Sequence, residues 1–356
     1  MTLPARRALV AVVLVAVTAA FATTDDPVRE AAGPTASTPP PAAVVTTAAT
    51  TSSTTTTTTT TLPPTFPLTG RPAPDQAAVA RAVVTVKIDN AAAARPQIGV
   101  DHADVVYEEL TEGITRFVAL FHSSDAEGAG PVRSVRPADA DLVTVAGGVL
   151  AFSGGSPAAV AVAASAPLTL VTEADTQAMV RRAGRPAPYN LYTSTRVLRS
   201  RAPGDAAGPG PFAPFLRDGQ PFAPPEAAPA GSISLQPAPF LRASYAWDGE
   251  AGTWRRSTDG APHLLEGGAQ LAPTTVIVQF ANYLTFEADA AVQYPEVVGS
   301  GDAWVFAAGM VGRGTWTKPS AGEPTVYAAA DGSPMALPPG QTWVHLVAPG
   351  TPVDVA

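Results

Sequence analysis

The chain has 356 residues, enough for two modest domains with cores of their own, and its formal net charge is −8. Its lysines and arginines do not cluster as they do in nucleic-acid-binding proteins, so no nucleic-acid partner is expected. The absence of cysteine excludes disulfides, a thiol nucleophile, Cys-ligated zinc and a lipid-bearing cysteine.

Residues 1–22 have the pattern of a secretory signal peptide. Arg6 and Arg7 precede an apolar run over residues 8–20, and Ala20-Phe21-Ala22 supplies an A-x-A cleavage site. The run is shorter than the about 20 residues that a membrane-spanning helix needs. An uncleaved anchor is the alternative, and the chain would then contact the membrane through this segment. We therefore expect a secreted or cell-envelope-associated, extracytoplasmic protein.

Two segments are predicted to be linkers. Residues 23–66 are rich in Thr, Pro and Ala, with an unbroken threonine run over residues 54–61, and they predict a disordered stalk, either O-glycosylated or unadorned. Residues 202–231 are dense in proline and glycine and predict a junction between domains. We expect Phe212, Phe215 and Phe222 of this junction to dock on a neighbouring surface.

The two remaining segments differ in their strand and helix patterns. Residues 67–201 predict the strands "VVTVKID", "ADVVYEEL", "ITRFVALF" and "GVLAFS", followed by a helix with Ser156 as N-cap and Pro157 at its first position. Residues 232–356 predict almost only strands: the hairpins "RASYAWDGEAGTWRRS" and "DAWVFAAGMVGRGTWTK", and the strands "TTVIVQFA" and "QTWVHLVAP". The predicted fold class is α+β, with an N-terminal mixed α/β sandwich domain and a smaller β-rich domain.

Arg116 opens the strand "RFVALF", which is apolar on both faces and therefore expected to be buried. A buried arginine needs an acidic partner. If Thr111-Glu112-Gly113 forms a three-residue hairpin loop, Glu108 lies opposite Arg116, whereas a two-residue loop would place Glu109 there. A cross-strand ion pair and a ligand-binding role are both consistent with this pattern.

The stretch "GPVRSVRPADADL" holds Arg133 and Arg136 in a loop braced by two prolines, and Pro137 disfavours helical dihedrals at Arg136. The two arginines are either neutralised by Asp139, Asp141 and the Glu108/Glu109 pair, or they clamp a phosphate or carboxylate. We expect at least one of them within reach of Asp89, Glu108 or Glu109, beside Arg116. Likewise, the turn through Gly154, Gly155 and Ser156 is either an anion site at a helix start or simply a capped helix. The candidate ligand-binding residues are Asp89, Asn90, Arg95, Glu108, Arg116, Arg133, Arg136, Gly154, Gly155, Ser156, Asn190 and Tyr192.

Metal, cofactor and hydrolase signatures are not found. The four histidines do not form a ligand pair, so neither a metal nor a cofactor is expected, and His345 is interpreted as a strand residue that faces solvent. A G-x-S-x-G motif is absent from the sequence. The five tryptophans are expected to pack in the core or across strands; if all are buried, the β-rich domain has no aromatic sugar site.

Several motifs resemble those of the YerB-like bacterial envelope lipoproteins. In the first half these are "VKIDNAAAARPQIGVDHADVVYEELTEGITRFVALF", "GPVRSVRP", "SGGSP" and "PYNLYTS", and in the second half "GTWTKPS", "YAAADGSPMAL" and "PPGQTWVHLVAP". The resemblance covers residues 67–349 and implies a secreted or membrane-tethered envelope protein with a mixed α/β domain and a β-rich domain. This family has no established biochemical role. The chain departs from it in lacking the lipid-bearing cysteine and in having Tyr189 where the family tends to have histidine.

The sequence supports two hypotheses about function. The first is an exported envelope protein that binds an anionic ligand, a cell-wall polymer or a partner protein. The alternative is an envelope enzyme that acts on a phosphorylated or glycan cell-wall precursor. A nucleophile and base pair cannot be named from the sequence, so the first hypothesis is preferred and enzymatic activity stays open.

Overall fold

The computed structural model of the protein describes residues 63–356. The predicted signal peptide and most of the predicted stalk lie outside the described residues. Thr65 pairs with Pro72 in a β-bridge and Phe66 is buried, so the last residues assigned to the stalk belong to the folded part. Between residues 63 and 356, no helix is long and apolar enough to cross a membrane.

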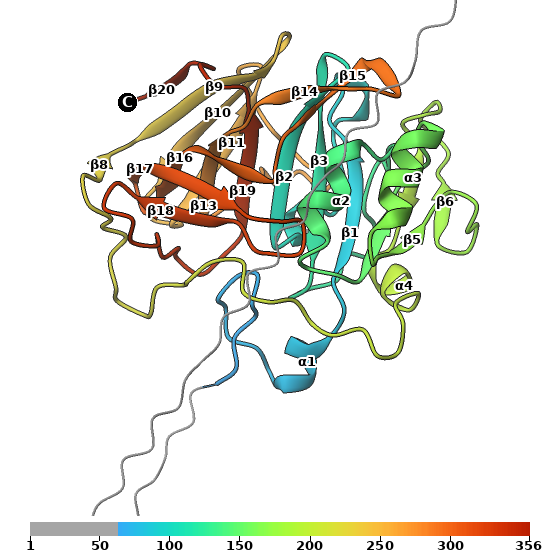
Figure 1. The fold of residues 1–356 in the computed structure, drawn as a ribbon, viewed down its shortest axis with the longest axis horizontal. Coiled ribbons are helices and arrows are strands. Elements are labelled where there is room, and N and C mark those ends of the chain that lie inside the picture. The colour runs from blue at the N-terminus through green and yellow to red at the C-terminus, as the bar shows by residue number, and fades with distance from the viewer. Residues whose placement is uncertain (1–62) are drawn as a thin grey trace, which may run out of the picture. The chain divides into compact units, whose positions relative to one another are not determined.

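A mixed sheet of eleven strands contains strands from both halves of the chain (Figure 1). Its order is β18-β17-β16-β13-β19-β2-β3-β1-β4-β5, and β8 also pairs with β17. The first half contributes β1 (Val84–Asp89), β2 (Val105–Thr111), β3 (Ile114–Phe121), β4 (Val149–Ala151) and β5 (Thr169–Val171). The rest are β8 (Ala228–Pro229), β13 (Thr275–Phe280), β16 (Gly299–Ala307), β17 (Met310–Lys318), β18 (Val326–Ala329) and β19 (Thr342–Val347).

Strand β19 joins the two halves. It lies between β13 and β2 and runs parallel to both, with Thr342 opposite Val105 and Leu346 opposite Glu109. The strand "QTWVHLVAP" is thus confirmed as β19, but β2, one of the two strands that it pairs with, comes from the first half of the chain. Whether residues 67–201 and 232–356 fold as separate domains stays a prediction.

A five-stranded sheet covers one face of the large sheet. It consists, in spatial order, of β12 (Ala261–Pro262), β11 (Thr253–Thr258), β10 (Leu241–Asp248), β9 (Ser232–Ala238) and β20 (Val353–Val355). Tyr245 and Trp254 of this sheet form a buried apolar cluster with Val276 and Phe306 of the large sheet. Both predicted hairpins, β10–β11 and β16–β17, are confirmed.

Helices and a hairpin cover other parts of the large sheet. The helices are α1 (Gln76–Ala80), α2 (Pro137–Val143), α3 (Pro157–Ser165) and α4 (Thr195–Arg199), with 3-10 turns at Ala92–Ala94 and Val100–His102. Helix α3 begins as predicted, because the Ser156 hydroxyl accepts a hydrogen bond of 3.3 Å from the Ala159 amide. Two small two-stranded sheets complete the fold: β6 (Met179–Arg181) with β7 (Leu191–Thr193), and β14 (Tyr283–Phe286) with β15 (Asp289–Pro295).

The mixed α+β fold is confirmed in part, because strand greatly outweighs helix in the described residues. Phe222 is buried, and Phe212 and Phe215 pack against the same apolar cluster, as predicted for the junction. The tryptophans also pack as predicted. Trp254, Trp316 and Trp343 are buried, whereas the half-buried Trp247 and Trp304 pack on neighbouring aromatic rings.

Candidate functional site

Two adjacent acids of β2 enter two different buried polar clusters. Successive side chains of a strand point to opposite faces, so Glu108 and Glu109 lie on opposite faces of the large sheet. Glu109 belongs to the arginine cluster, which consists of Lys87, Asp89, Glu109, Glu112, Arg116, Arg133, Arg136 and Asp139. Glu108 belongs to the interlayer cluster, which consists of Asn90, Gln97, Glu108, Thr115, Tyr245, Arg256, Thr258, His263, Trp343 and His345.

The β2–β3 turn sets the position of Arg116. Thr111 pairs with Ile114, so the loop has two residues, and Glu109 lies opposite Arg116. Of the two alternatives, the two-residue loop with Glu109 opposite Arg116 is therefore confirmed, and the three-residue loop with Glu108 in that position is wrong. Both loop residues have positive φ, 53° at Glu112 and 80° at Gly113, as a type I′ hairpin turn requires.

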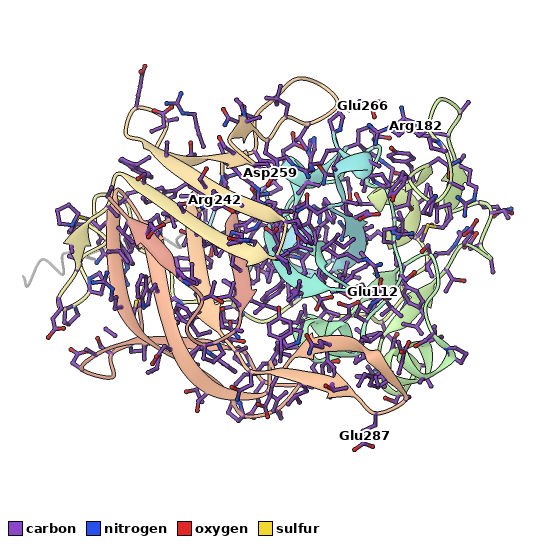
Figure 2. The ribbon with its side chains drawn as sticks, turned by 90° about the horizontal axis from the view of Figure 1, so that it is seen from above. Glu112, Arg182, Arg242, Asp259, Glu266 and Glu287 are labelled. Carbon is purple, nitrogen blue, oxygen red and sulfur yellow. The ribbon has the colours of Figure 1, made fainter. Side chains whose placement is uncertain are left out.

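Glu112 bridges two buried arginines. One of its carboxylate oxygens lies 3.1 Å from Nη2 of Arg116, and the other accepts a hydrogen bond from Nη2 of Arg136. The guanidinium of Arg116 also donates to the carbonyl oxygen of Ser134 at 3.3 Å. Figure 2 shows Glu112 at the end of the β2–β3 hairpin. The expected cross-strand pair of Arg116 is thus replaced by a pair with the turn residue.

The loop before α2 brings Arg133 and Arg136 to this end of the sheet. Arg136 is the N-cap of α2 and has extended dihedrals, φ −125° and ψ 162°, as Pro137 requires. Nε of Arg133 lies 2.8 Å from Oδ2 of Asp89. The prediction that one of these arginines reaches Asp89, Glu108 or Glu109 is confirmed.

Lys87 forms ion pairs with two of the remaining acids. Its ammonium lies between Glu109 and Asp139, 2.6 Å from the latter, and all three side chains are buried. The backbone amide of Arg136 donates to the other Asp139 oxygen. Asp139 therefore neutralises Lys87. The two loop arginines pair with Asp89 and Glu112, and not with Asp139, Asp141 or the Glu108/Glu109 pair as one of the two alternatives had it.

Burial and like charges shift the pKa of two groups of the arginine cluster, Arg116 and Glu109. Burial, followed by the charge of Arg136, lowers the pKa of Arg116 to about 10, which leaves it protonated at neutral pH. Burial raises the pKa of Glu109 to about 7, because the attraction of Lys87 only partly offsets the desolvation and Asp139 adds a second negative charge.

A pocket of about 260 Å³ lies beside Glu112 and Arg136. Its walls come from the β2–β3 turn, the loop before α2, the start of α3, and the β14–β15 hairpin. The lining residues are Glu112, Ser134, Arg136, Gly155, Ser156, Ala159, Asp289 and Val292. We call this cavity the arginine pocket. Of the sequence candidates, Arg136, Gly155 and Ser156 line it, and Arg116 contacts the lining residue Glu112. Gly154 precedes Gly155, whereas Asp89 and Arg133 pair with each other and do not line the pocket.

The interlayer cluster is sealed between the two sheets. Arg256 of β11 lies 2.9 Å from Glu108 and donates to the Tyr245 hydroxyl at 2.5 Å. The indole of Trp343 donates to Glu108 at 3.1 Å. Burial alone would raise the pKa of Glu108, but Arg256 above all outweighs this and lowers it to about 2. The cluster thus ties the two halves of the chain together electrostatically.

His345 lies within this cluster, so its interpretation as a solvent-facing residue was wrong. It is fully buried, and its ring lies 2.7 Å from the Tyr245 hydroxyl. All six residues of strand β19 are buried, because both of its faces are covered. The residue pattern of this strand alone does not indicate that both faces are covered.

The stability of the fold is expected to fall as the pH drops from about 6.5 to 4.5. Burial lowers the pKa of His122, His263 and His345 to about 4, 3 and 4, so above these values and below 6.5 only the unfolded chain binds their protons. Asp104, Glu109 and Asp141 act in the opposite sense, because burial raises their pKa and the folded chain binds their protons first. We expect the three histidines to dominate, because their unfolded pKa lies at the top of this pH window and their folded pKa lies below its end. The expected net loss is about 1 kcal/mol per pH unit. Urea denaturation at pH 7 and pH 5 measures it, and equal or greater stability at pH 5 would contradict it.

The other sequence candidates lie elsewhere. Asn90 donates to Glu108 in the interlayer cluster, and Arg95 pairs with Asp259 at 3.3 Å. The Asn190 side chain accepts a hydrogen bond of 2.6 Å from Arg181. Tyr192 lies beneath the guanidinium of Arg182 and lines a separate pocket of about 440 Å³. The structure therefore divides the candidates among three regions.

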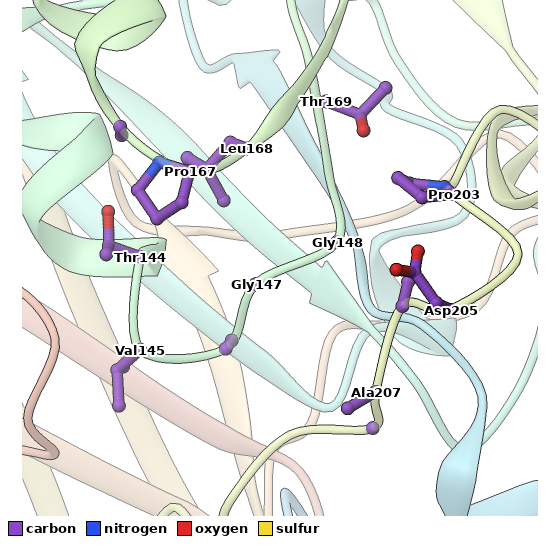
Figure 3. Close-up of a pocket in the computed structure, with 14 residues that line it drawn as sticks. Thr144, Val145, Gly147, Gly148, Pro167, Leu168, Thr169, Pro203, Asp205 and Ala207 are labelled. Carbon is purple, nitrogen blue, oxygen red and sulfur yellow. The ribbon is translucent and has the colours of Figure 1, made fainter.

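A larger pocket is lined by few groups that could bind or react with a charged ligand. It has a volume of about 570 Å³ and is lined by the α2–β4 turn, the segment before β5, and residues 203–208 (Figure 3). Asp205 is its one ionisable lining residue. No group of three or more His, Asp or Glu side chains that could hold a metal occurs within residues 63–356.

Sequence reasoning missed Lys87, Glu112 and Arg256. A lysine inside the apolar strand "VVTVKID" was a signal for Lys87, because a strand buried on both faces needs an acid for it. For Glu112 the signal was a glutamate in a turn position that favours Asn, Asp or Gly. Arg256 gave no comparable signal, because it lies in a strand of alternating exposure.

Both halves of the chain match models of one family. Residues 68–207 match the N-terminal domain of a protein of unknown function (DUF3048), and residues 236–344 match its C-terminal domain. YerB of Bacillus subtilis (strain 168), which carries the name of a candidate lipoprotein, is 27% identical over 294 residues, or 79% of this chain and 85% of YerB. The crystal structure of the YerB protein from Bacillus subtilis matches with a TM-score of 0.71 and 25% identity, over 82% of this chain and 99% of that one. The chain therefore belongs to the YerB-like family of two-domain proteins of unknown function.

Proposed function

We propose that this protein is an exported cell-envelope protein that binds an anionic ligand, through a phosphate or carboxylate group, in the arginine pocket. The signal pattern of residues 1–22 and the name of the relative YerB as a candidate lipoprotein support the location. The ligand class is inferred from the guanidinium groups, which bind both anions with paired donors.

One observation carries the proposal: Glu112, the acid that pairs with both Arg116 and Arg136, is exposed. Glu112 is 42% exposed, whereas the side chains of Arg116 and Arg136 are 2% and 8% exposed. In the Lys87 and Arg256 pairs both partners are buried, as expected of pairs that serve the fold. When the acid that pairs with two arginines reaches solvent, another anion can replace it. The released carboxylate is then hydrated, and no buried charge is left without a partner.

A third guanidinium group lies near Arg116 and Arg136. Arg133, 19% exposed at its side chain, adds a third guanidinium close enough for its charge to act on Arg116. Because Lys87 is already occupied by Glu109 and Asp139, these acids are not available to the arginines. Three guanidinium groups therefore neighbour one another beside the pocket, which Arg136 lines together with the acids Glu112 and Asp289.

Replacing Arg136 by glutamine is expected to weaken binding of inorganic phosphate or acetate at least about tenfold, because one of two charge-assisted donors is lost. Isothermal titration calorimetry at low ionic strength measures the affinity. The control is Arg196→Gln, which removes the same charge from an exposed pair with Glu127. The proposal fails if the wild-type protein binds neither anion, or if both variants bind with wild-type affinity.

A second function, an envelope enzyme, rests on the raised pKa of Glu109. A carboxyl group with a pKa of about 7 is suited to general acid or base catalysis. Glu109 is buried, however, and is not among the residues that line the arginine pocket. Turnover of polyprenyl-linked wall precursors, with or without Mg²⁺, that is lost in Glu109→Gln would favour this alternative over simple binding.

A further inference from the structure

We infer that Glu112 is an internal ligand, and that the incoming anion takes the place of its carboxylate between Arg116 and Arg136. This inference rests on the proposed function and specifies its binding position. Each carboxylate oxygen contacts a different guanidinium, Oε2 that of Arg116 and Oε1 that of Arg136. A phosphate or carboxylate group of a ligand offers the same arrangement, two oxygen atoms on one central atom.

The β2–β3 turn places Glu112 beside the two arginines, but the turn conformation itself does not require a glutamate at this position. The hairpin loop consists of Glu112 and Gly113, both with positive φ. A residue with a Cβ is disfavoured at such a dihedral, and Asn, Asp or Gly fit the first position better. Local turn preference therefore does not explain the glutamate, whereas its contacts with the two arginines do.

Displacement leaves the buried charges paired. The guanidinium of Arg116 keeps its contact with the Ser134 carbonyl, and both arginines exchange one anion for another. Glu112 lies at the hairpin end and is already substantially exposed, so its carboxylate can hydrate in water when released. By contrast, releasing Glu109 would leave a buried carboxylate beside Asp139 and is far more costly.

The arginine pocket limits the size of the chemical group attached to the anion. Its volume of about 260 Å³ corresponds to about nine water molecules at liquid density. This suits a head group of the size of one sugar or one amino acid. Ser134 and Ser156 on the walls offer hydroxyl groups to the neutral part of such a ligand.

An internal ligand reduces the apparent affinity, because the incoming anion binds only the fraction of molecules in which the site is free. Removing its charge should therefore strengthen binding. We expect Glu112→Gln to bind inorganic phosphate about tenfold to hundredfold more tightly than the wild-type protein, the range for one charge-assisted contact. The matched control is Glu287→Gln, which removes the same charge from an exposed position at the tip of the β14–β15 hairpin (Figure 2).

Calorimetric titration with phosphate, and separately with acetate, distinguishes the outcomes. Tighter binding by Glu112→Gln, with Glu287→Gln unchanged, supports displacement. Equal affinity of Glu112→Gln and the wild-type protein overturns this inference but leaves the proposed function standing. An equal gain in both variants shows a general charge effect and overturns it as well. Binding by none of the three proteins overturns the proposed function too.

Glu112→Gln also removes the negative partner of two arginines, so its folding needs a separate measurement. A thermal melt with increasing phosphate provides this, because a ligand that binds the folded state raises the melting temperature. The displacement inference expects a larger rise for Glu112→Gln than for the wild-type protein. A rise of the same size in both contradicts it, even if the variant is less stable without phosphate.

Discussion

Replacing Glu108 by alanine is expected to lower the free energy of unfolding by about 3–5 kcal/mol, because it leaves Arg256 as an uncompensated buried charge. Arg256 is fully buried and contacts Glu108, Tyr245 and the face of Trp343. The substitution also removes the acceptor of the Trp343 indole. Urea or guanidinium denaturation at pH 7 measures the loss.

Two further variants make this test specific. Glu266→Ala breaks the exposed pair with Arg182 (Figure 2), 3.0 Å long, and should cost less than about 1 kcal/mol. The double variant Glu108→Leu with Arg256→Met removes both buried charges and should recover part of the loss. If Glu108→Ala costs no more than Glu266→Ala, the interlayer cluster does not hold the two sheets together.

Replacing Lys87 by methionine is expected to cost about 3–5 kcal/mol at pH 8 and clearly less at pH 5. Without the ammonium, Glu109 and Asp139 face each other as buried carboxylates. The pKa of Glu109, which burial already raises, then lies further above that of the unfolded chain, because the attraction of Lys87 is lost. The folded variant therefore takes up a proton as the pH falls and gains stability relative to the wild-type protein. Denaturation at both pH values measures the difference.

Lys318→Met provides the control for Lys87. Lys318 is also buried, but its ammonium donates to the carbonyl oxygens of Ala321 and Glu323. Asp141 and Glu323 act on Lys318 only through their charges, without a side-chain ion pair, so the cost of its replacement should change less between pH 8 and pH 5 than that of Lys87. An equal loss for Lys87→Met at the two pH values would show that Glu109 does not take up this proton in the folded variant.

Local patterns predicted the elements well. The strands around Lys87, Arg116 and Trp343 and the helix start at Ser156 are explained by alternation, glycine positions and capping, which depend on neighbours along the chain. Pro137 likewise predicted the extended dihedrals of Arg136. Each of these features is decided within a few residues.

Pairings between distant segments could not be predicted in this way. The parallel contact of β19 with β2 brings His345 beside Glu108, over more than two hundred residues of chain, and no local pattern encodes it. The partner of Arg116 depended on one residue of loop length, because a shift of one residue exchanges the faces of a strand. The sequence therefore predicted the arginines and the pairing of one of them with Asp89, but not Glu112 as the partner of Arg116 and Arg136.

The most direct test of the account is a crystal structure of the protein with bound phosphate. We expect the phosphate between the guanidinium groups of Arg116 and Arg136, in the position of the Glu112 carboxylate, with the Glu112 side chain turned towards solvent. Phosphate bound elsewhere, or an unchanged contact of Glu112 with both arginines at saturating phosphate, would contradict the assignment of this pocket as a displaceable anion site.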